Sequence, residues 1–523
     1  MGRTGLFIFL IISCGSALAQ SPPALVFNVE RFEVQGDNPL DADATAAALE
    51  PFVGEYDGID GLLGASDALE SAFVAAGHNF HRVSLPPQEL DRGIVILNIS
   101  TFAVGEVKIS GNQHFSTDNI RASLPKVING QAPQLREVSR SLAVANQHPH
   151  KQLKVSFRDS DEQADSLDAV VNVQDKRQWN VFGNLNNIGT EDTGATRMQL
   201  GGLYSNLTGH DDILTTAITI SPDNVDDVFQ FGAFYQIPVY ALSGWLSGFY
   251  VRSDVDVGGV QNFFDVSGSG EFIGLNFKRS LIPVGRYKHS LSVGLQDRSF
   301  DTAISNAITG AQIRGISTTV RSRPINLRYD GSYNWTATSF DFFIDAVKNL
   351  SFGGHNRDED YAAVRAVAKS QWKAIRFGAL VTQRLPRDFV GVFRLNGQYS
   401  RNPLIPGEQL GFGGERTIRG FAERSIAGDI GLIANLELWS PPVAQLYGVR
   451  FLTFLDAGHK QLNDPLGRQR ASDSLSSYGV GMRWNWQEML ALSVDYGQPL
   501  AHADGERSDG GTSKWHVNLQ VRY

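Results

Sequence analysis

The stretch Trp515-His516-Val517-Asn518-Leu519-Gln520-Val521-Arg522-Tyr523 decides the fold. Its odd-numbered residues are apolar or aromatic and its even-numbered residues are polar. Successive side chains of a strand point to opposite faces, so this alternation predicts a strand with one apolar and one polar face. Trp515 and Tyr523 put aromatic rings on the apolar face, which suits the closing strand of an outer-membrane barrel. An edge strand of a soluble sandwich would show the same alternation, and the rest of the chain has to decide between the two.

The segment 177–523 predicts a transmembrane β-barrel. Alternating strands follow one another there, separated by polar, glycine- or aspartate-rich turns. At roughly 20–22 residues for a strand and its turn, 347 residues give about sixteen strands. A barrel that begins and ends in the periplasm needs an even number of strands, so we interpret 361–385 as one long strand. The chain has no apolar run long enough for a membrane helix, and its mean hydropathy is −0.17.

The first 19 residues have the pattern of a secretory signal peptide. Arg3 supplies a positive charge, residues 6–12 form an apolar run, and Ala17-Leu18-Ala19 is a small-x-small cleavage site. The alternative is a lipoprotein box ending at Cys14, which is less well placed after the apolar run. Cys14 is the only cysteine, so cleavage after Ala19 would leave a chain with no disulfide, zinc–thiolate site or cysteine nucleophile.

Charge divides the chain into two regions. Residues 20–176 carry 12 Lys and Arg against 22 Asp and Glu, whereas residues 177–523 carry 33 of each. Nucleic-acid binding calls for a basic face, so we expect no nucleic-acid partner.

The acidic region predicts two copies of one small α/β plan, over 26–102 and 103–176. Each copy reads strand, helix, helix, strand, strand, with Gly77 as a helix C-cap in the first and Ser116 as an N-cap in the second. The expected helices are 42–49, 62–76, 116–124 and 135–145, and the expected strands are 27–34, 79–85, 93–99, 104–110, 152–158 and 166–173.

A glycine-rich motif occupies the longest gap between late strands, about 401–428. It reads Gln409-Leu410-Gly411-Phe412-Gly413-Gly414-Glu415-Arg416-Thr417-Ile418-Arg419-Gly420-Phe421, and Phe454-Leu455-Asp456-Ala457-Gly458 follows on a strand. Phe454, Asp456 and Gly458 share one face of that strand. If this face lines the lumen, an inward-folding loop could place Arg419 on Asp456 as a bidentate pair.

The tip Arg419-Gly420-Phe421, followed by F-x-D-x-G, resembles the lid-loop signature of the superfamily of barrel assembly proteins and polypeptide transporters. Gly413, Gly414 and Ile418 belong to the same motif. The two α/β modules resemble POTRA domains, with Ile109-Ser110-Gly111-Asn112 in the second copy. Two such modules, and residues 146–149 and 398–409, make the chain most similar to the TpsB family, the outer-membrane transporters of two-partner secretion. The resemblance covers nearly all of the expected mature chain.

The resemblance implies an outer-membrane transporter with N-terminal domains in the periplasm. Its partners would be a large, β-rich exoprotein that is unfolded in transit, outer-membrane lipid, and the barrel assembly machinery. An exposed sheet edge can bind an extended chain, and Leu153, Val155 and Phe157 lie on our candidate edge. Many family members begin with a plug helix; about four residues separate Ala19 from Ala24, so we expect none here and take the lid loop as the main block.

Other functions fit less well. A barrel assembly factor shares the lid loop and the C-terminal strand and is the main alternative; a passive porin would need neither the modules nor the Arg419 motif. H-E-x-x-H, the phosphate loop G-x-x-x-x-G-K-[ST] and G-x-S-x-G are absent from the sequence, so we expect no enzyme and no cofactor. His148-Pro149-His150 is interpreted as an exposed pair of histidines rather than a metal site.

Overall fold

The computed structural model describes residues 26–523 except 58, 90, 162, 164–165, 191–192, 226–227, 255–257, 261–263, 267–268, 306–311, 468 and 501–512. The signal peptide expected over residues 1–19 lies outside this range. Two compact units are present. One is built mainly from the chain up to Glu106, and the other joins Val107–Val127 and Arg136–Phe157 to Ala169–Tyr523. No described helix is long and apolar enough to cross a membrane.

The first module is a small α/β domain. Its elements are β1 (Val26–Val29), β2 (Arg31–Gln35), α1 (Ala42–Leu49), β3 (Gly54–Asp57), α2 (Asp60–Ala76), β4 (His81–Ser84) and β5 (Ile94–Thr101). Strands β2, β5 and β4 form a three-stranded sheet in that order, and α2 buries Leu69 and Phe73 in the core. Gly77 ends α2 in the left-handed conformation with φ 98°, as its sequence position predicts.

One prediction for this module was wrong in detail. The strand expected over 27–34 is divided at Glu30, because β1 pairs with β3 whereas β2 pairs in parallel with β5. Strand β3 was not predicted. It is four residues long and contains Gly54, so it carries no alternating pattern of its own.

The second module repeats the plan. It contains β6 (Ala103–Ser110), α3 (Thr117–Ala122), α4 (Leu135–Ala145), β7 (Lys151–Asp159) and β8 (Ser166–Asp175). The Ser116 hydroxyl accepts a hydrogen bond from the Asn119 amide and caps α3. The sheet order is β6-β8-β7, so β7 lies at an edge of the described sheet.

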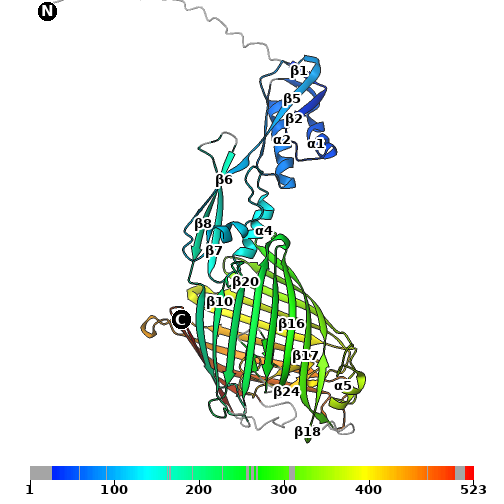
Figure 1. The fold of residues 1–523 in the computed structure, drawn as a ribbon, viewed down its shortest axis with the longest axis vertical. Helices are drawn as coiled ribbons and strands as arrows, with labels where there is room; N and C mark the ends of the chain where they lie inside the picture. The colour runs from blue at the N-terminus through cyan, green and yellow to red at the C-terminus, as the bar shows by residue number, and fades with distance from the viewer. Residues whose placement is uncertain are drawn as a thin grey trace, which may run out of the picture. The chain divides into compact units, whose positions relative to one another are not determined.

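Within the described residues most of the remaining strands form one closed antiparallel barrel of sixteen strands (Figure 1). Outside the barrel, β14 (Gly258–Val260) and β15 (Phe264–Val266) pair with each other, and two short strands of a later loop do the same. Strand β17 pairs with β19 along one half and β18 along the other, so β18 and β19 are one strand broken at Arg323. The predicted barrel of about sixteen strands is therefore confirmed. The strands are β9 (Trp179–Asn186), β10 (Arg197–Ser205), β11 (Ile213–Ile220), β12 (Phe229–Val239), β13 (Gly244–Ser253), β16 (Ser269–Ser280), β17 (Tyr287–Ser305), β18 (Gln312–Ser322), β19 (Pro324–Asn334), β20 (Thr338–Asn349), β21 (Lys373–Arg384), β22 (Val390–Tyr399), β25 (Ile430–Trp439), β26 (Arg450–Gln461), β27 (Ser472–Trp486), β28 (Leu490–Pro499) and β29 (Lys514–Arg522).

Strand β29 closes the barrel by pairing with β28 on one side and β9 on the other. Its apolar face is exposed at Trp515 and Val521, as a lipid-facing surface requires, and His516 on the polar face is buried. The segment 361–385 departs from the single long strand that we expected. Its first part holds the end of α5 (Asp358–Val364) and a loop, and strand β21 begins only at Lys373.

Candidate functional site: the lid loop

The lid loop connects β22 to β25 and covers residues 400–429, close to the expected 401–428. It contains two short strands, β23 (Leu410–Phe412) and β24 (Ile426–Gly428), which pair with each other. Gly413 and Gly414 follow β23 with φ values of 101° and 108°, a region that side chains other than glycine rarely adopt. A Cβ on Gly414 would lie 2.0 Å from the Glu423 carboxylate. These glycines let the loop turn back toward its tip.

The tip of the loop is held by a bidentate ion pair between Arg419 and Asp456. Nε and Nη2 of Arg419 donate to the two Asp456 carboxylate oxygens over 2.8 and 2.9 Å, and the Arg419 backbone amide donates over 3.1 Å. Both side chains are buried. The structure thus brings together the two residues that the motif spacing suggested.

Further acidic and aromatic groups surround the same guanidinium. Its Nη1 lies 2.9 Å from Glu437 Oε1 and 3.3 Å from Asp495 Oδ2, and its carbon lies 3.5 Å from the centre of the Phe454 ring. Arg483 also balances the charge of the Asp495 carboxylate, to which it donates two hydrogen bonds of 2.6 and 2.8 Å. One arginine of the loop therefore contacts strands β25, β26 and β28 at once.

The sequence analysis identified Phe454 and Asp456 but missed Glu437, Asp495 and His516. His516 Nε2 accepts a hydrogen bond of 3.0 Å from the Gly420 amide. The alternating pattern of the last nine residues already places His516 on the polar face, so a signal for it was present. Glu437 and Asp495 depend on the register between distant strands, which the sequence does not reveal.

An apolar cluster holds the sides of the tip. Phe412, Ile418 and Phe421 pack with barrel residues Ile433 and Leu475, and all five are buried. Gly458 makes room for this cluster, because a Cβ there would lie 2.6 Å from Ile418 and 2.8 Å from Phe412. Ile418, Phe421 and Gly458 thus act in packing, and Arg419 and Asp456 supply the ion pair.

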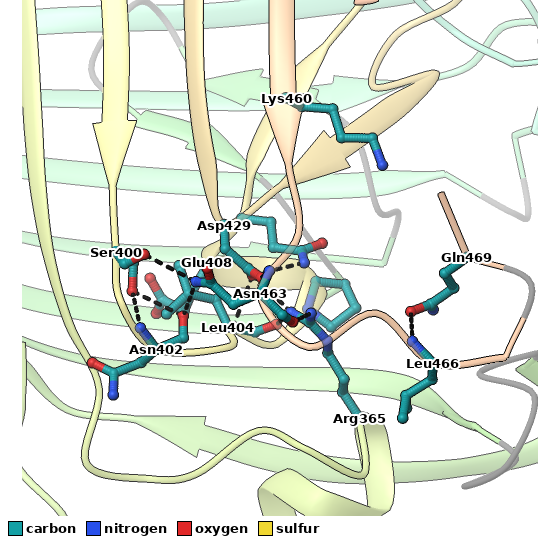
Figure 2. Close-up of polar contacts among 12 residues, drawn as sticks. Arg365, Ser400, Asn402, Leu404, Glu408, Asp429, Lys460, Asn463, Leu466 and Gln469 are labelled. Atoms are coloured by element: carbon teal, nitrogen blue, oxygen red, sulfur yellow. Dashed lines mark hydrogen bonds and ion pairs between the residues drawn. The ribbon is translucent and has the colours of Figure 1, made fainter. Parts of the chain in front are cut away.

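The two ends of the lid loop meet at Asp429 (Figure 2). One Asp429 carboxylate oxygen accepts hydrogen bonds from the Leu404 amide, the Gln409 side chain and Arg365, over 2.9, 3.0 and 2.7 Å. The other accepts from the Asn463 amide over 2.8 Å. We call residues 400–409 and Asp429 the neck of the lid loop.

A cavity of about 960 Å³ lies beside the lid loop. Arg298, Arg376, Arg394, Arg416, Glu408 and Glu415 are among its lining residues. Glu408 is buried, and its Oε2 pairs with Arg298 at 2.8 Å and with Arg376 at 3.0 Å. The lumen next to the loop thus carries charged groups beside aromatic side chains such as Phe343 and Phe377.

The candidate client-binding edge is β7. Leu153 is buried, Val155 and Phe157 are half-buried, and the alternate side chains from Gln152 to Arg158 are exposed. The Leu153 side chain therefore belongs to the module's core. What β7 can offer an extended chain is its backbone and its exposed face.

The expectation that His148 and His150 are exposed was wrong. Both are buried, and His150 Nδ1 lies 2.8 Å from the Ser205 hydroxyl. Burial lowers the pKa of His148 to about 4. Among the described residues no group of three His, Cys, Asp or Glu side chains is arranged to bind a metal ion.

A buried ion pair next to these histidines was not predicted. Lys151 Nζ lies 2.5 Å from Asp211 Oδ2 and also donates to Asn119 and Ser123. Asp211 lies in the turn between β10 and β11, and both charged side chains are almost fully buried. Burial lowers the pKa of Lys151, and Asp211 only partly offsets this effect. Burial raises the pKa of Asp211, but Lys151 and hydrogen bonds outweigh it and leave that pKa below its usual range.

A closed sixteen-stranded barrel, small α/β modules before it and an arginine-locked lid loop define a class of outer-membrane proteins that handle polypeptides. Residues 166–484 match the family described as haemolysin secretion/activation protein ShlB/FhaC/HecB, and residues 27–101 match the ShlB-type POTRA domain. The chain belongs to this family. It is an outer-membrane transporter of two-partner secretion, with its N-terminal domains in the periplasm, and it acts with a secreted exoprotein.

Individual relatives agree with this assignment. The outer membrane transporter CdiB of Escherichia coli O6:K15:H31 is 23% identical over 94% of this chain and 82% of its own length. The heme/hemopexin transporter protein HuxB of Haemophilus influenzae is 20% identical over 92% of this chain and 85% of its own length. The solved structure of CdiB from Escherichia coli has a TM-score of 0.74 at 19% identity, covering 98% of this chain and 93% of that one.

Proposed function

We propose that the Arg419–Asp456 pair sets the resting position of the lid loop, and that export requires the loop tip to leave this position and return to it. The observation that supports this proposal is that Arg419 forms ion pairs with Asp456, Glu437 and Asp495 at once inside the barrel. A single displacement of the tip would break all three contacts together. A loop held in this way has a docked and an undocked state, which is what a gate needs.

We further propose that the periplasmic modules hold the unfolded exoprotein by strand addition. Strand β7 at the edge of its sheet supports this, because an edge offers N–H and C=O groups to an extended chain and selects little for sequence. Consecutive residues of a strand point their N–H groups to opposite edges, so proline at Lys154 or at Val155 of β7 removes an N–H from the outer edge in one of the two variants. If β7 binds the client, at least one of the two variants lowers client cross-linking; full cross-linking by both would rule out this edge.

The remaining partners are outer-membrane lipid and the barrel assembly machinery. Exposed apolar side chains alternate with buried ones along the strands, for example Leu432 and Leu436 beside Ile433 on β25, and such a band suits contact with lipid. We propose that the barrel assembly machinery inserts this barrel into the outer membrane. The chain lacks a phosphate loop, so we propose that folding of the exoprotein outside the cell drives export.

The test compares the host with and without the gene by mass spectrometry of culture supernatant and outer membrane. Loss of one or two large exported proteins from the supernatant, with an unchanged outer membrane, supports a dedicated transporter and identifies its partner. Depletion of many barrel proteins from the membrane would instead indicate an assembly factor. Because one fold can carry either function, this measurement is needed to separate them.

A further inference from the structure

The segment 350–372, which connects β20 to β21, carries the short helix α5 and lies at one end of the barrel (Figure 1). Tyr361 and Trp372 in this segment are fully buried. The Tyr361 hydroxyl lies 2.7 Å from the Ser322 hydroxyl and donates to the Arg321 carbonyl over 3.1 Å. The segment therefore packs on β18, a strand that it does not directly follow.

The same segment also contacts the connection that follows β26. Nη2 of Arg365 donates to the Asn463 carbonyl over 2.6 Å, and Asn463 lies just after β26. Around the barrel the strands run β17, β18 with β19, β20, β21, β22, β25 and β26. Contacts at both β18 and the end of β26 mean that residues 350–372 connect parts of the barrel's rim that lie five strand positions apart.

The neck of the lid loop packs against the same segment (Figure 2). Leu404 and Ile405 are buried in one apolar cluster with Tyr361 and Trp372. Nη1 of Arg365 donates to the Leu404 carbonyl over 2.8 Å and to Asp429 over 2.7 Å. We call segment 350–372 together with the neck the crossbar.

The crossbar lies at the extracellular end. The barrel begins with β9 and ends with β29 at the opposite end, where Tyr523 and Val181 exchange two backbone hydrogen bonds. That opposite end faces the periplasm, because the N-terminal domains are periplasmic. An exported chain would therefore meet the lid tip and then the crossbar.

We propose that the Arg365–Asp429 pair is an extracellular latch, a second closure that acts in series with the Arg419–Asp456 pair and must open during each export event. This inference rests on export through the lumen. The Asp429 carboxylate joins three segments, namely 350–372 through Arg365, the start of the lid loop through Leu404, and the β26–β27 connection through Asn463. Removing the Arg365 guanidinium would therefore weaken the attachment of all three segments to one another. The latch and the Arg419–Asp456 pair, which we call the tip lock, are built from different residues. Variants can therefore separate their effects.

The first test is Arg365→Leu, which keeps apolar volume but removes the cation. In planar bilayers without any client, we expect the ratio of closed to open pore to fall by about tenfold or more, because a buried carboxylate loses its charged partner. Arg357→Leu is the matched control, since Arg357 is the N-cap residue of the same helix and pairs with Glu359 at the surface, where both side chains are 74% exposed. Wild-type conductance from a folded Arg365→Leu barrel would overturn the latch. Faster migration of unheated protein in a gel establishes that the barrel is folded.

The second test asks whether the crossbar must move. Arg365→Cys and Asn463→Cys are combined and joined from outside the cell by a bis-maleimide of about the length of an arginine side chain. Each single variant with the same reagent is the control, and Cys14 is the only other cysteine in the sequence. Loss of export only in the cross-linked double variant supports the latch, and undiminished export through a cross-linked crossbar overturns it. If the lumen were not the route at all, Arg419→Ala would also leave export unchanged, which separates failure of the latch from failure of the proposed function.

Discussion

Gly420 at the lid tip and Gly497 on β28 meet backbone to backbone. A Cβ on Gly497 would lie 2.5 Å from the Gly420 amide nitrogen, and a Cβ on Gly420 would lie 2.9 Å from the Gly497 carbonyl. Gly420 also has a φ of 90°. This close approach brings the Gly420 amide to His516 and the neighbouring Arg419 to its acids. Docking of the lid thus depends on two positions that have no room for a side chain.

Gly497→Ala should therefore weaken lid docking while leaving the barrel intact. The added methyl group collides with backbone, which has little freedom to move, and overpacking of this kind costs about 1–3 kcal/mol. We expect a higher open probability of the pore and reduced export of the exoprotein. Gly391→Ala on β22 is the control, because the nearest atom to its Cβ would be a Leu385 methyl carbon at 3.8 Å. Equal behaviour of the two variants would show that the glycine contact does not matter for the lid.

Arg419→Ala should sharply reduce export without reducing the amount of inserted barrel. Removing the guanidinium leaves Asp456 and Glu437 buried without their cation, and breaking a buried pair costs about 3–5 kcal/mol. Arg419→Lys restores the charge but not the bidentate geometry, so we expect at most partial recovery. Arg416→Ala, an exposed position in the same loop, is the control. Export is measured in culture supernatant and insertion in the membrane fraction; unchanged export by Arg419→Ala would contradict the role of the tip lock.

Much of the fold could be predicted because local periodicity records it. The helices over 42–49 and 135–145 coincide with α1 and α4, whose side-chain patterns are set within each helix. The Arg419–Asp456 contact could be predicted from the sequence for a different reason, because it rests on the spacing of two recognisable motifs. By contrast, α5 is a seven-residue helix whose apolar side chains are buried by strands and by the lid loop, which are distant in sequence.

The parts that could not be predicted depend on strand register. Glu437 and Asp495 reach Arg419 only because β25, β26 and β28 present the right residues at the same height in the lumen. Likewise, the burial of His148 depends on the fold around it, where its ring lies edge-on to Phe115 and its Nδ1 accepts the His150 amide. The composition of residues 148–150 suggested an exposed loop, but composition alone says nothing about contacts with residues elsewhere in the fold.

Lys151→Met should destabilise the second compact unit around the turn between β10 and β11. The substitution leaves Asp211 buried without its cation, at a cost of about 3–5 kcal/mol, so protease accessibility of the 206–212 turn should rise. The double variant Lys151→Met with Asp211→Asn removes both charges and should recover part of the loss, because asparagine tolerates the φ of 62° at this position and keeps a side-chain oxygen for Ser123 and Tyr240. Lys154→Met, exposed on the same strand, is the control. A single variant as resistant as the wild type would mean that the pair contributes little.

Acidification should loosen the same region through His148. Burial lowers the pKa of His148 from 6.5 to about 4, so the unfolded chain binds the proton more readily than the folded one. The stability of the folded state is therefore complete above pH about 6.5 and falls as pH drops toward about 4, by up to about 3 kcal/mol. His148→Gln cannot take up the proton and should reduce this dependence, leaving the part due to His150, whose pKa burial also lowers. His210→Gln, at an exposed turn position, should leave the dependence unchanged. Hydrogen exchange of helix α3 from pH 7.5 to 4 measures the effect; the same pH dependence in His148→Gln as in the wild type would assign it to other groups.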